Sequence, residues 1–146
     1  MKTTHSEHYA IDDSIERIDF DQVRNMLKNA FWSKGIGIEE IKKGASNSAL
    51  VVAAYDTDHS IAGYLRVISD KTRFAYILDV YVDEQHRHKG IARAMVRFAQ
   101  NHPDLRDVYQ WLLITRDAHE VYRGAGFQPL PEPDKWMCIL KQRPNR

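Results

Sequence analysis

The sequence has a single cysteine, Cys138, so no disulfide can form within the chain and folding needs no oxidising compartment. It has no apolar run long enough to cross a membrane, and its polar first residues lack the apolar segment of a secretory signal peptide. A charge excess is also missing, because 21 Lys and Arg face 20 Asp and Glu. We therefore expect a cytoplasmic protein without a nucleic-acid or membrane partner.

The length and composition are those of one globular domain. A chain of 146 residues can bury a continuous apolar core, and 43% apolar with 28% charged residues is typical of a folded protein. We expect residues 1–146 to form a single domain, in which residues 1–12 are a polar tail of weak pattern.

Two kinds of periodicity alternate along the chain. Residues 74–82 are rich in aromatic and β-branched side chains, which is typical of a strand. In residues 91–99 the apolar side chains recur at intervals of three and four, the spacing of one helical stripe. Similar patterns predict strands at 14–18, 49–55, 61–68, 108–114 and 136–140, and helices at 21–32, 38–43 and 117–123. This order predicts an α/β (α+β) fold, with helices flanking a central mixed, mainly antiparallel sheet.

The junction between the strand at 74–82 and the helix at 91–99 has the features of an anion site. Backbone N–H groups at a helix start lack partners within the helix, and the helix dipole adds positive charge. Gly90 allows the backbone to approach an anion closely, while small Ala92 keeps the next turn clear. Arg87, His88 and Lys89 add local positive charge to a chain that is otherwise nearly neutral.

These residues also carry a family resemblance. The pattern Arg87-x-x-Gly90-x-Ala92 resembles the pyrophosphate-binding signature of the GNAT acetyltransferases. A second segment, Ala118-x-x-Val121-Tyr122-x-x-x-Gly126-Phe127, resembles the short helix and glycine turn of the same family. Residues 111–119 further resemble a bacterial subgroup of small GNAT proteins whose substrates are mostly uncharacterised, and the likeness covers roughly residues 48–140.

The resemblance implies an N-acetyltransferase that passes the acetyl group of acetyl-coenzyme A directly to a primary amine in a ternary complex. It implies that the strand before the loop splays from its neighbour and offers main-chain groups to the pantetheine arm. Thr115 occupies a place where the family often has Asn, and a homodimer is common in the family. The cofactor residues implied are Val80, Tyr81, Val82, Arg87, His88, Lys89, Gly90, Ile91, Ala92, Arg93 and Thr115.

The resemblance also suggests how the reaction is catalysed. Tyr122 matches a tyrosine that protonates the leaving thiolate in many members, and a phenol of pKa about 10 is protonated at rest. The attacking amine must lose a proton, and the candidate bases are Asp79 and, through water, Tyr76 or Tyr81. Tyr76 stands where some members have a glutamate base. A structural role for Asp79, accepting hydrogen bonds inside an apolar strand, is an equal alternative.

Several alternatives stay open at this point. Phe31 and Trp32 are candidates for the acceptor pocket together with Tyr76, although an aromatic pair at a helix end also suits a core. His86 and His88 lack a third ligand, so we expect no metal. A non-catalytic module that senses acetyl-coenzyme A is the alternative to an enzyme, and Tyr122 favours the enzyme. Small metabolites, antibiotics, polyamines and peptides all fit as acceptors.

Overall fold

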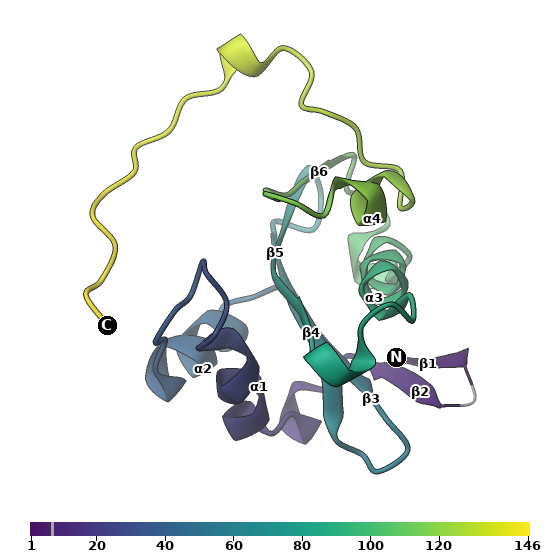
Figure 1. Ribbon diagram of the computed structural model, residues 1–146. Coiled ribbons are helices and arrows are strands. Elements are labelled where there is room, and N and C mark those ends of the chain that lie inside the picture. The colour runs from purple at the N-terminus through teal and green to yellow at the C-terminus, as the bar shows by residue number, and fades with distance from the viewer. Residues whose placement is uncertain (7) are drawn as a thin grey trace.

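A mixed six-stranded sheet organises the residues that the computed structural model describes, which are 1–6 and 8–146 (Figure 1). The strands follow one another across the sheet in chain order, and every neighbouring pair is antiparallel except β5 and β6, which are parallel. The strands are β1 (Lys2–Ser6), β2 (Tyr9–Asp12), β3 (Leu50–Tyr55), β4 (Ile61–Ser69), β5 (Phe74–Val82) and β6 (Gln110–Leu112). The α-helices are α1 (Phe20–Leu27), α2 (Ile38–Ser46), α3 (Ile91–Gln100) and α4 (His119–Arg123). Short 3₁₀ helices are η1 (Ile15–Arg17), η2 (Glu84–His86), η3 (Pro103–Leu105) and η4 (Pro133–Lys135). The expected fold class is thereby confirmed.

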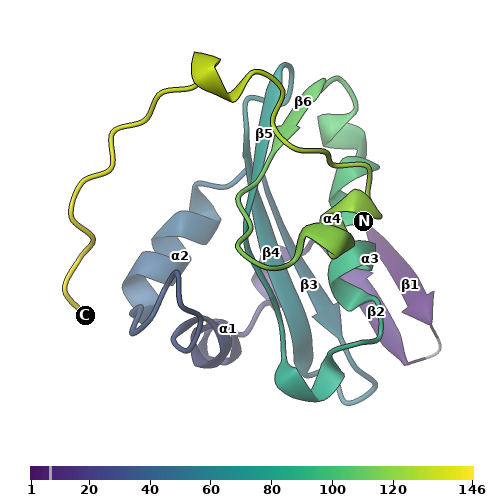
Figure 2. The ribbon, with the colours of Figure 1, turned by 45° about the horizontal axis from the view of Figure 1, so that its top comes forward.

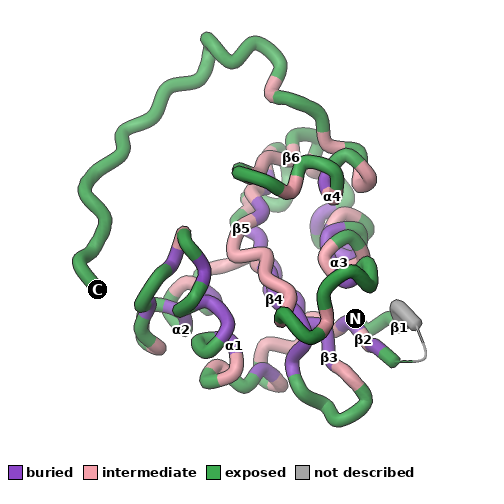
Figure 3. Tube along the Cα trace, in the orientation of Figure 1, coloured by how far each residue is buried: buried purple, intermediate pink, exposed green. Residues whose placement is uncertain are grey.

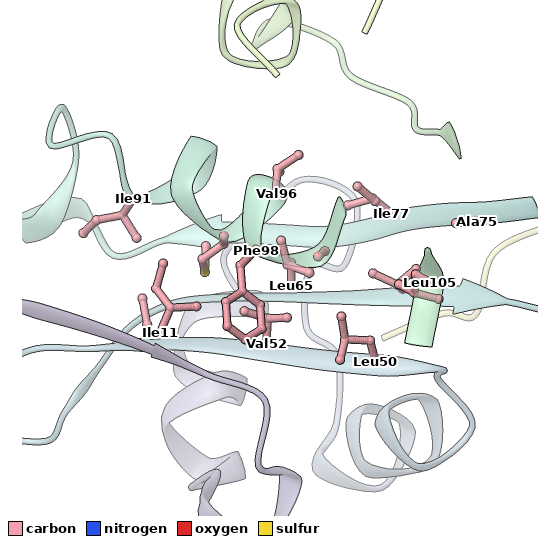
Figure 4. Packing of buried hydrophobic residues seen from close by; sticks show 14 of the residues in the cluster. Ile11, Leu50, Val52, Leu65, Ala75, Ile77, Ile91, Val96, Phe98 and Leu105 are labelled. Carbon is pink, nitrogen blue, oxygen red and sulfur yellow. The ribbon is translucent and has the colours of Figure 1, made fainter. Parts of the chain in front are cut away.

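The helices cover both faces of the sheet, with α1 and α2 on one side and α3 and α4 on the other (Figures 1 and 2). Alternate residues of β3 explain this, because Val52 and Ala54 belong to the core under α3 while Val51 and Ala53 belong to the core under α1 and α2. Figure 4 shows the first of these cores from close by. Gly63 of β4 brings α3 close, because a Cβ there would lie 2.9 Å from the Met95 Cε atom. Among the described residues, no helix combines the length and apolar character needed to cross a membrane.

The ends of the chain differ from the prediction. Residues 1–12 are not a tail, because β1 and β2 pair with each other and β2 pairs with β3, which buries Tyr9 and Ile11. Residues 14–18 contain η1 in place of a strand. Residues 136–140 form no strand, and residues 131–146 run exposed from α4 towards the side of α1 and α2 (Figures 1 and 3). Whether residues 1–12 and 136–140 form strands depends on pairing with distant parts of the chain, which the local sequence pattern does not reveal.

The sheet opens between β5 and the edge strand β6. Their parallel pairing covers only three residues of β5 and ends at Tyr76, which lies opposite Leu112. On its other side, β5 has a bulge, because Asp79 and Val80 together oppose Leu65 of β4. Asp79 has a positive φ of 56° at this bulge. The second half of β5 therefore diverges from β6, as the sequence analysis expected.

Candidate functional site

The loop from β5 to α3 is shaped to receive an anion. His88 and Gly90 both have positive φ, 64° and 76°, a backbone conformation common in loops that present amides to an anion. Gly90 is the N-cap of α3 and provides no capping side chain, and the first helical turn contains no acidic residue. Residues 87–90 are all exposed. The start of α3 therefore has no side-chain cap or acidic residue that would compete with an anion, and the phosphate role expected of these residues stays a prediction.

The cation Arg87 is held beside this loop. Its Nε atom donates to the carbonyl oxygen of Val82 at 3.0 Å, and its guanidinium carbon lies 5.4 Å from the centre of the Tyr81 ring. Arg93 lies one turn into α3, where its guanidinium packs against Gly124 after α4. Arg87 thus contacts the end of β5, whereas Arg93 contacts the turn after α4.

The diverging half of β5 leads from this loop into the sheet. No other strand among the described residues pairs with its β6-facing edge beyond Tyr76. Val80 and Val82 pack against the core under α3, whereas Tyr81 packs against the core under α1 and α2. Their side chains are thereby held in the two cores. The main chain between them is left to accept an extended ligand arm.

A cavity of about 550 Å³ lies beside the end of the β5–β6 pairing, and its β5 residues are Phe74 and Tyr76. Tyr76, Thr115 and Tyr122 line it, together with Trp111 of β6. Tyr122 comes from α4, is only 9% exposed, and stacks edge-on against Phe127 with ring centres 6.1 Å apart. Burial, with the negative charge of Asp117 adding to it, raises the pKa of Tyr122 to about 12. The phenol is therefore neutral at pH 7.

A second aromatic group stands beside the site on the α1 and α2 side. Phe31 and Trp32, in the loop after α1, meet edge-on with ring centres 5.0 Å apart, and Trp32 lies 6.3 Å from Tyr81 of β5. Arg116 follows Thr115 of the cavity and stacks on the exposed Phe31 ring, 3.7 Å from its centre. Arg116 therefore connects the aromatic group to the cavity, a contact between residues 85 positions apart that the sequence pattern does not predict.

Asp79 is engaged on both carboxylate oxygens. Its Oδ2 atom accepts from the Arg66 Nε atom at 2.7 Å, and its Oδ1 atom accepts from the Trp32 Nε1 atom at 3.2 Å. The sequence analysis above did not include the ion pair between Arg66 and Asp79. An arginine in the apolar strand at 61–68 and an aspartate in the next strand are a signal from which this pair could have been predicted. This arrangement favours the structural alternative for Asp79 over a free base.

Two other residues have local partners. The Thr115 Oγ1 atom accepts from the Ala118 backbone N–H at 3.0 Å, so this side chain shapes the turn that enters α4. The His86 Nδ1 atom lies 2.7 Å from the Tyr9 hydroxyl, and its Nε2 atom lies 3.6 Å from Asp56. His86 therefore faces β2 and the β3–β4 turn.

Comparison with known proteins supports this geometry. The sequence model of the acetyltransferase (GNAT) domain matches residues 46–129. No curated protein matches the sequence. A crystal structure of a GNAT-family protein from Xanthomonas campestris pv. campestris is similar, with 29% identity, a TM-score of 0.85, and coverage of 92% of this chain and 94% of that one.

More distant structures share the fold. Glucosamine-6-phosphate N-acetyltransferase from Arabidopsis thaliana has 17% identity and a TM-score of 0.62, with 93% of this chain and 99% of that chain covered. The GNAT-family N-acetyltransferase YhbS from Escherichia coli, solved in complex with CoA, has 20% identity and a TM-score of 0.54. That likeness covers 68% of this chain and 58% of YhbS.

Proposed function

The chain belongs to the GNAT family and is an acetyltransferase of that class, and on this premise we propose that it transfers the acetyl group of acetyl-coenzyme A to a primary amine by direct attack. The observation that carries the proposal is the open set of amides at the start of α3, next to the unpaired half of β5 and the Tyr122 cavity. A cytoplasmic location suits the coenzyme and the near-neutral charge of the chain.

The proposed cofactor path follows these three features in order. The pyrophosphate lies on the amides of residues 88–92, with Arg87 and Lys89 adding charge and Arg93 nearer the adenosine end. The pantetheine arm runs along the edge of β5 and pairs with the main chain of residues 80–82. The thioester then reaches the cavity beside Tyr122, which is the deeper end of the path.

In the transfer step, the amine nitrogen bonds to the thioester carbonyl carbon and the carbon–sulfur bond breaks. The nitrogen loses one proton and the departing thiolate gains one, so the products are an amide and free coenzyme A. Tyr122 donates a hydrogen bond to the sulfur as its charge develops. Full proton transfer from a phenol of pKa about 12 to a thiolate of pKa ~8.5 costs about 5 kcal/mol. Proton transfer to the sulfur is therefore coupled to the loss of a proton from the nitrogen.

We assign Asp79 as a positioning residue. Its carboxylate fixes the Trp32 indole beside Tyr81 and neutralises Arg66, and both oxygens are already used in these contacts. Phe31, Trp32 and Tyr76 then border the path of the acceptor, with Arg116 at the same mouth. In this proposal the amine either arrives neutral or loses its proton to water.

The experiment compares Tyr122→Phe with Tyr109→Phe, which removes a hydroxyl from an exposed tyrosine hydrogen-bonded to Arg73. We expect Tyr122→Phe to lower kcat by roughly 10²–10⁴-fold, measured as thiol release across a panel of amines. The dissociation constant of acetyl-coenzyme A, measured by calorimetry, is expected to stay within about twofold, and Tyr109→Phe should leave both unchanged. Equal turnover in the two variants would exclude Tyr122 as the donor.

The same experiment tests the alternative function. A non-catalytic sensor would bind acetyl-coenzyme A with the same heat but release no thiol with any amine of the panel. The presence of a buried, neutral phenol in the cavity favours the enzyme, because a sensor has no use for a proton donor beside the thioester.

A further inference from the structure

His86 is the last residue of η2, which leads from β5 into the loop before α3, and it contacts two distant parts of the chain. Its Nδ1 atom lies 2.7 Å from the hydroxyl of Tyr9 in β2, and the two rings meet edge-on with centres 5.5 Å apart. Its Nε2 atom lies 3.6 Å from the Oδ2 atom of Asp56, in the turn from β3 to β4. In the neutral ring, an Nδ1 atom that accepts from the tyrosine hydroxyl leaves the ring proton on Nε2, facing Asp56. We call Tyr9, His86 and Asp56 the histidine cluster.

Both partners of His86 are themselves held in place. Tyr9 is buried and belongs to the core under α3. The Oδ1 atom of Asp56 accepts from the backbone N–H groups of Asp58 and Ser60 at 2.9 and 3.1 Å, so its Oδ2 atom is left to face the histidine. In Figure 2, η2 and the turn from β3 to β4 lie at the same end of the sheet. The imidazole is therefore held between a buried strand residue and a hydrogen-bonded turn.

The residues that follow His86 form the loop to which the pyrophosphate is proposed to bind. Residues 87–90 are exposed, and His88 and Gly90 have positive φ. Positive φ is unfavourable for a residue other than glycine, so the conformation at His88 depends on how the two ends of the loop are held. One end is Ile91, which is 2% exposed in the core under α3, and the other end is His86. The side-chain contacts of His86 therefore help to set the conformation of the loop.

From these contacts we propose that His86 is a positioning residue for coenzyme A, which holds residues 87–90 in the conformation that binds the pyrophosphate. Tyr9 and Asp56 fix the imidazole, and the Tyr9 ring also lies 5.8 Å from the Lys89 Nζ atom within the loop. A loop that already has its binding conformation need not be ordered when the ligand arrives, so its affinity is higher. The inference rests on the proposed function, because it takes the start of α3 as the pyrophosphate site.

The first test changes the imidazole itself. His86→Phe keeps an aromatic ring and removes both nitrogens, whereas His86→Asn keeps an oxygen acceptor near the position of Nδ1. We expect His86→Phe to raise the dissociation constant of coenzyme A, measured by calorimetry, about 3–10-fold, in line with the loss of one hydrogen bond. His86→Asn should restore the affinity to within about twofold of wild type, and adding Tyr9→Phe should abolish this rescue. An unchanged affinity in His86→Phe, or a rescue that persists without the Tyr9 hydroxyl, overturns the proposal.

The second test changes only the partner of the imidazole. Tyr9→Phe removes one oxygen atom and keeps the buried ring that faces Lys89. It should raise the dissociation constant of coenzyme A about 2–10-fold, whereas Tyr109→Phe, which removes an exposed hydroxyl, should leave it unchanged. If Tyr9 acts through His86, the double variant Tyr9→Phe/His86→Phe binds coenzyme A no more weakly than His86→Phe alone. Additive losses would mean that the two side chains act separately, which contradicts the proposal.

The third test separates positioning of the loop from a general structural loss. Turnover is measured with acetyl-coenzyme A and with S-acetylpantetheine, a thioester that lacks the pyrophosphate. In His86→Phe we expect KM for acetyl-coenzyme A to rise with the dissociation constant, while kcat, and kcat/KM for acetylpantetheine, stay within about twofold of wild type. An equal loss with both thioesters would place the defect outside the pyrophosphate loop and overturn the proposal. A wild type that binds coenzyme A but releases no thiol with any amine refutes acetyl transfer alone, because the calorimetric comparison still decides the role of His86.

Discussion

Replacing Gly90 with alanine tests whether the start of α3 binds the pyrophosphate of coenzyme A. Gly90 has φ 76° and ψ 15°, the left-handed region, which costs an alanine roughly 1–2 kcal/mol. For a chain of this length we expect the melting temperature to fall by roughly 3–8 °C. In the proposed binding mode the new methyl group also stands where the pyrophosphate would approach the amides, and each charge-assisted hydrogen bond lost costs about 1.5–3 kcal/mol. The dissociation constant of coenzyme A should therefore rise roughly 10–100-fold.

Substitutions at two other glycines distinguish the effect of backbone strain on stability from the effect of the new methyl group on coenzyme A binding. Gly126 also has a positive φ, 95°, and a Cβ there meets nothing within 4 Å, so Gly126→Ala should reproduce the loss of melting temperature without the loss of affinity. Gly37→Ala, at the N-cap of α2, meets nothing within 4 Å and has an ordinary φ of −89°, so it should leave the affinity unchanged and lower the melting temperature only through the weaker cap. Calorimetry with coenzyme A and thermal melting of the free proteins measure both quantities. If Gly90→Ala melts lower as calculated but binds coenzyme A within twofold of wild type, the pyrophosphate is not held at this helix start.

Three further predictions follow from the site. Asp79→Asn leaves the half-buried guanidinium of Arg66 without its counter-charge, so urea unfolding should show a loss of about 1–3 kcal/mol in the free energy of unfolding. If Asp79 only positions its neighbours, the substitution raises KM for the amine and leaves the pH profile of kcat unchanged. If the decline of kcat at low pH disappears in the variant, Asp79 is the base. Arg116→Gln removes the cation stacked on Phe31, worth roughly 0.5–1 kcal/mol, and should raise KM for the acceptor about two- to fivefold, while the exposed control Arg106→Gln should not. Burial raises the pKa of Tyr122 to about 12, above its unfolded value near 10, so the stability it contributes is complete below pH 10 and is lost as the pH rises from 10 to 12. Thermal melts should therefore decline over that range, and less steeply in Tyr122→Phe; identical slopes would contradict the buried phenol.

The anion loop was predictable because everything that forms it lies within a few residues. A strand pattern, a helical stripe and Gly90 between them specify a helix start with open amides, and the structure has these features at the predicted place. The splay of β5 followed from the family resemblance, and the end of its pairing at Tyr76 agrees with it. Local pattern and the family resemblance were sufficient to predict this loop.

The acceptor side was not predictable in the same way, because its contacts join distant parts of the chain. Trp32 reaches Asp79 across 47 positions, and Arg116 meets Phe31 from the opposite end of the sequence. The segment 136–140 illustrates the same limit, since its composition predicted a strand but the structure pairs it with no other strand. Sequence pattern fixes the tendency of a segment, whereas the choice of partner depends on the assembled sheet.

The bulge at Asp79 links the cofactor side of the molecule to the acceptor side. A bulge is what turns the end of β5 away from β6, and it requires a residue that tolerates positive φ at this position. Aspartate does so at lower cost than a bulky or β-branched residue, because its short polar side chain can bond locally. Here that side chain also binds Arg66 of β4 and Trp32 after α1, so the carboxylate that stabilises the bulge fixes the aromatic wall as well. A substitution at Asp79 should therefore affect the pantetheine path and the acceptor pocket together, which a base acting only on the amine would not do.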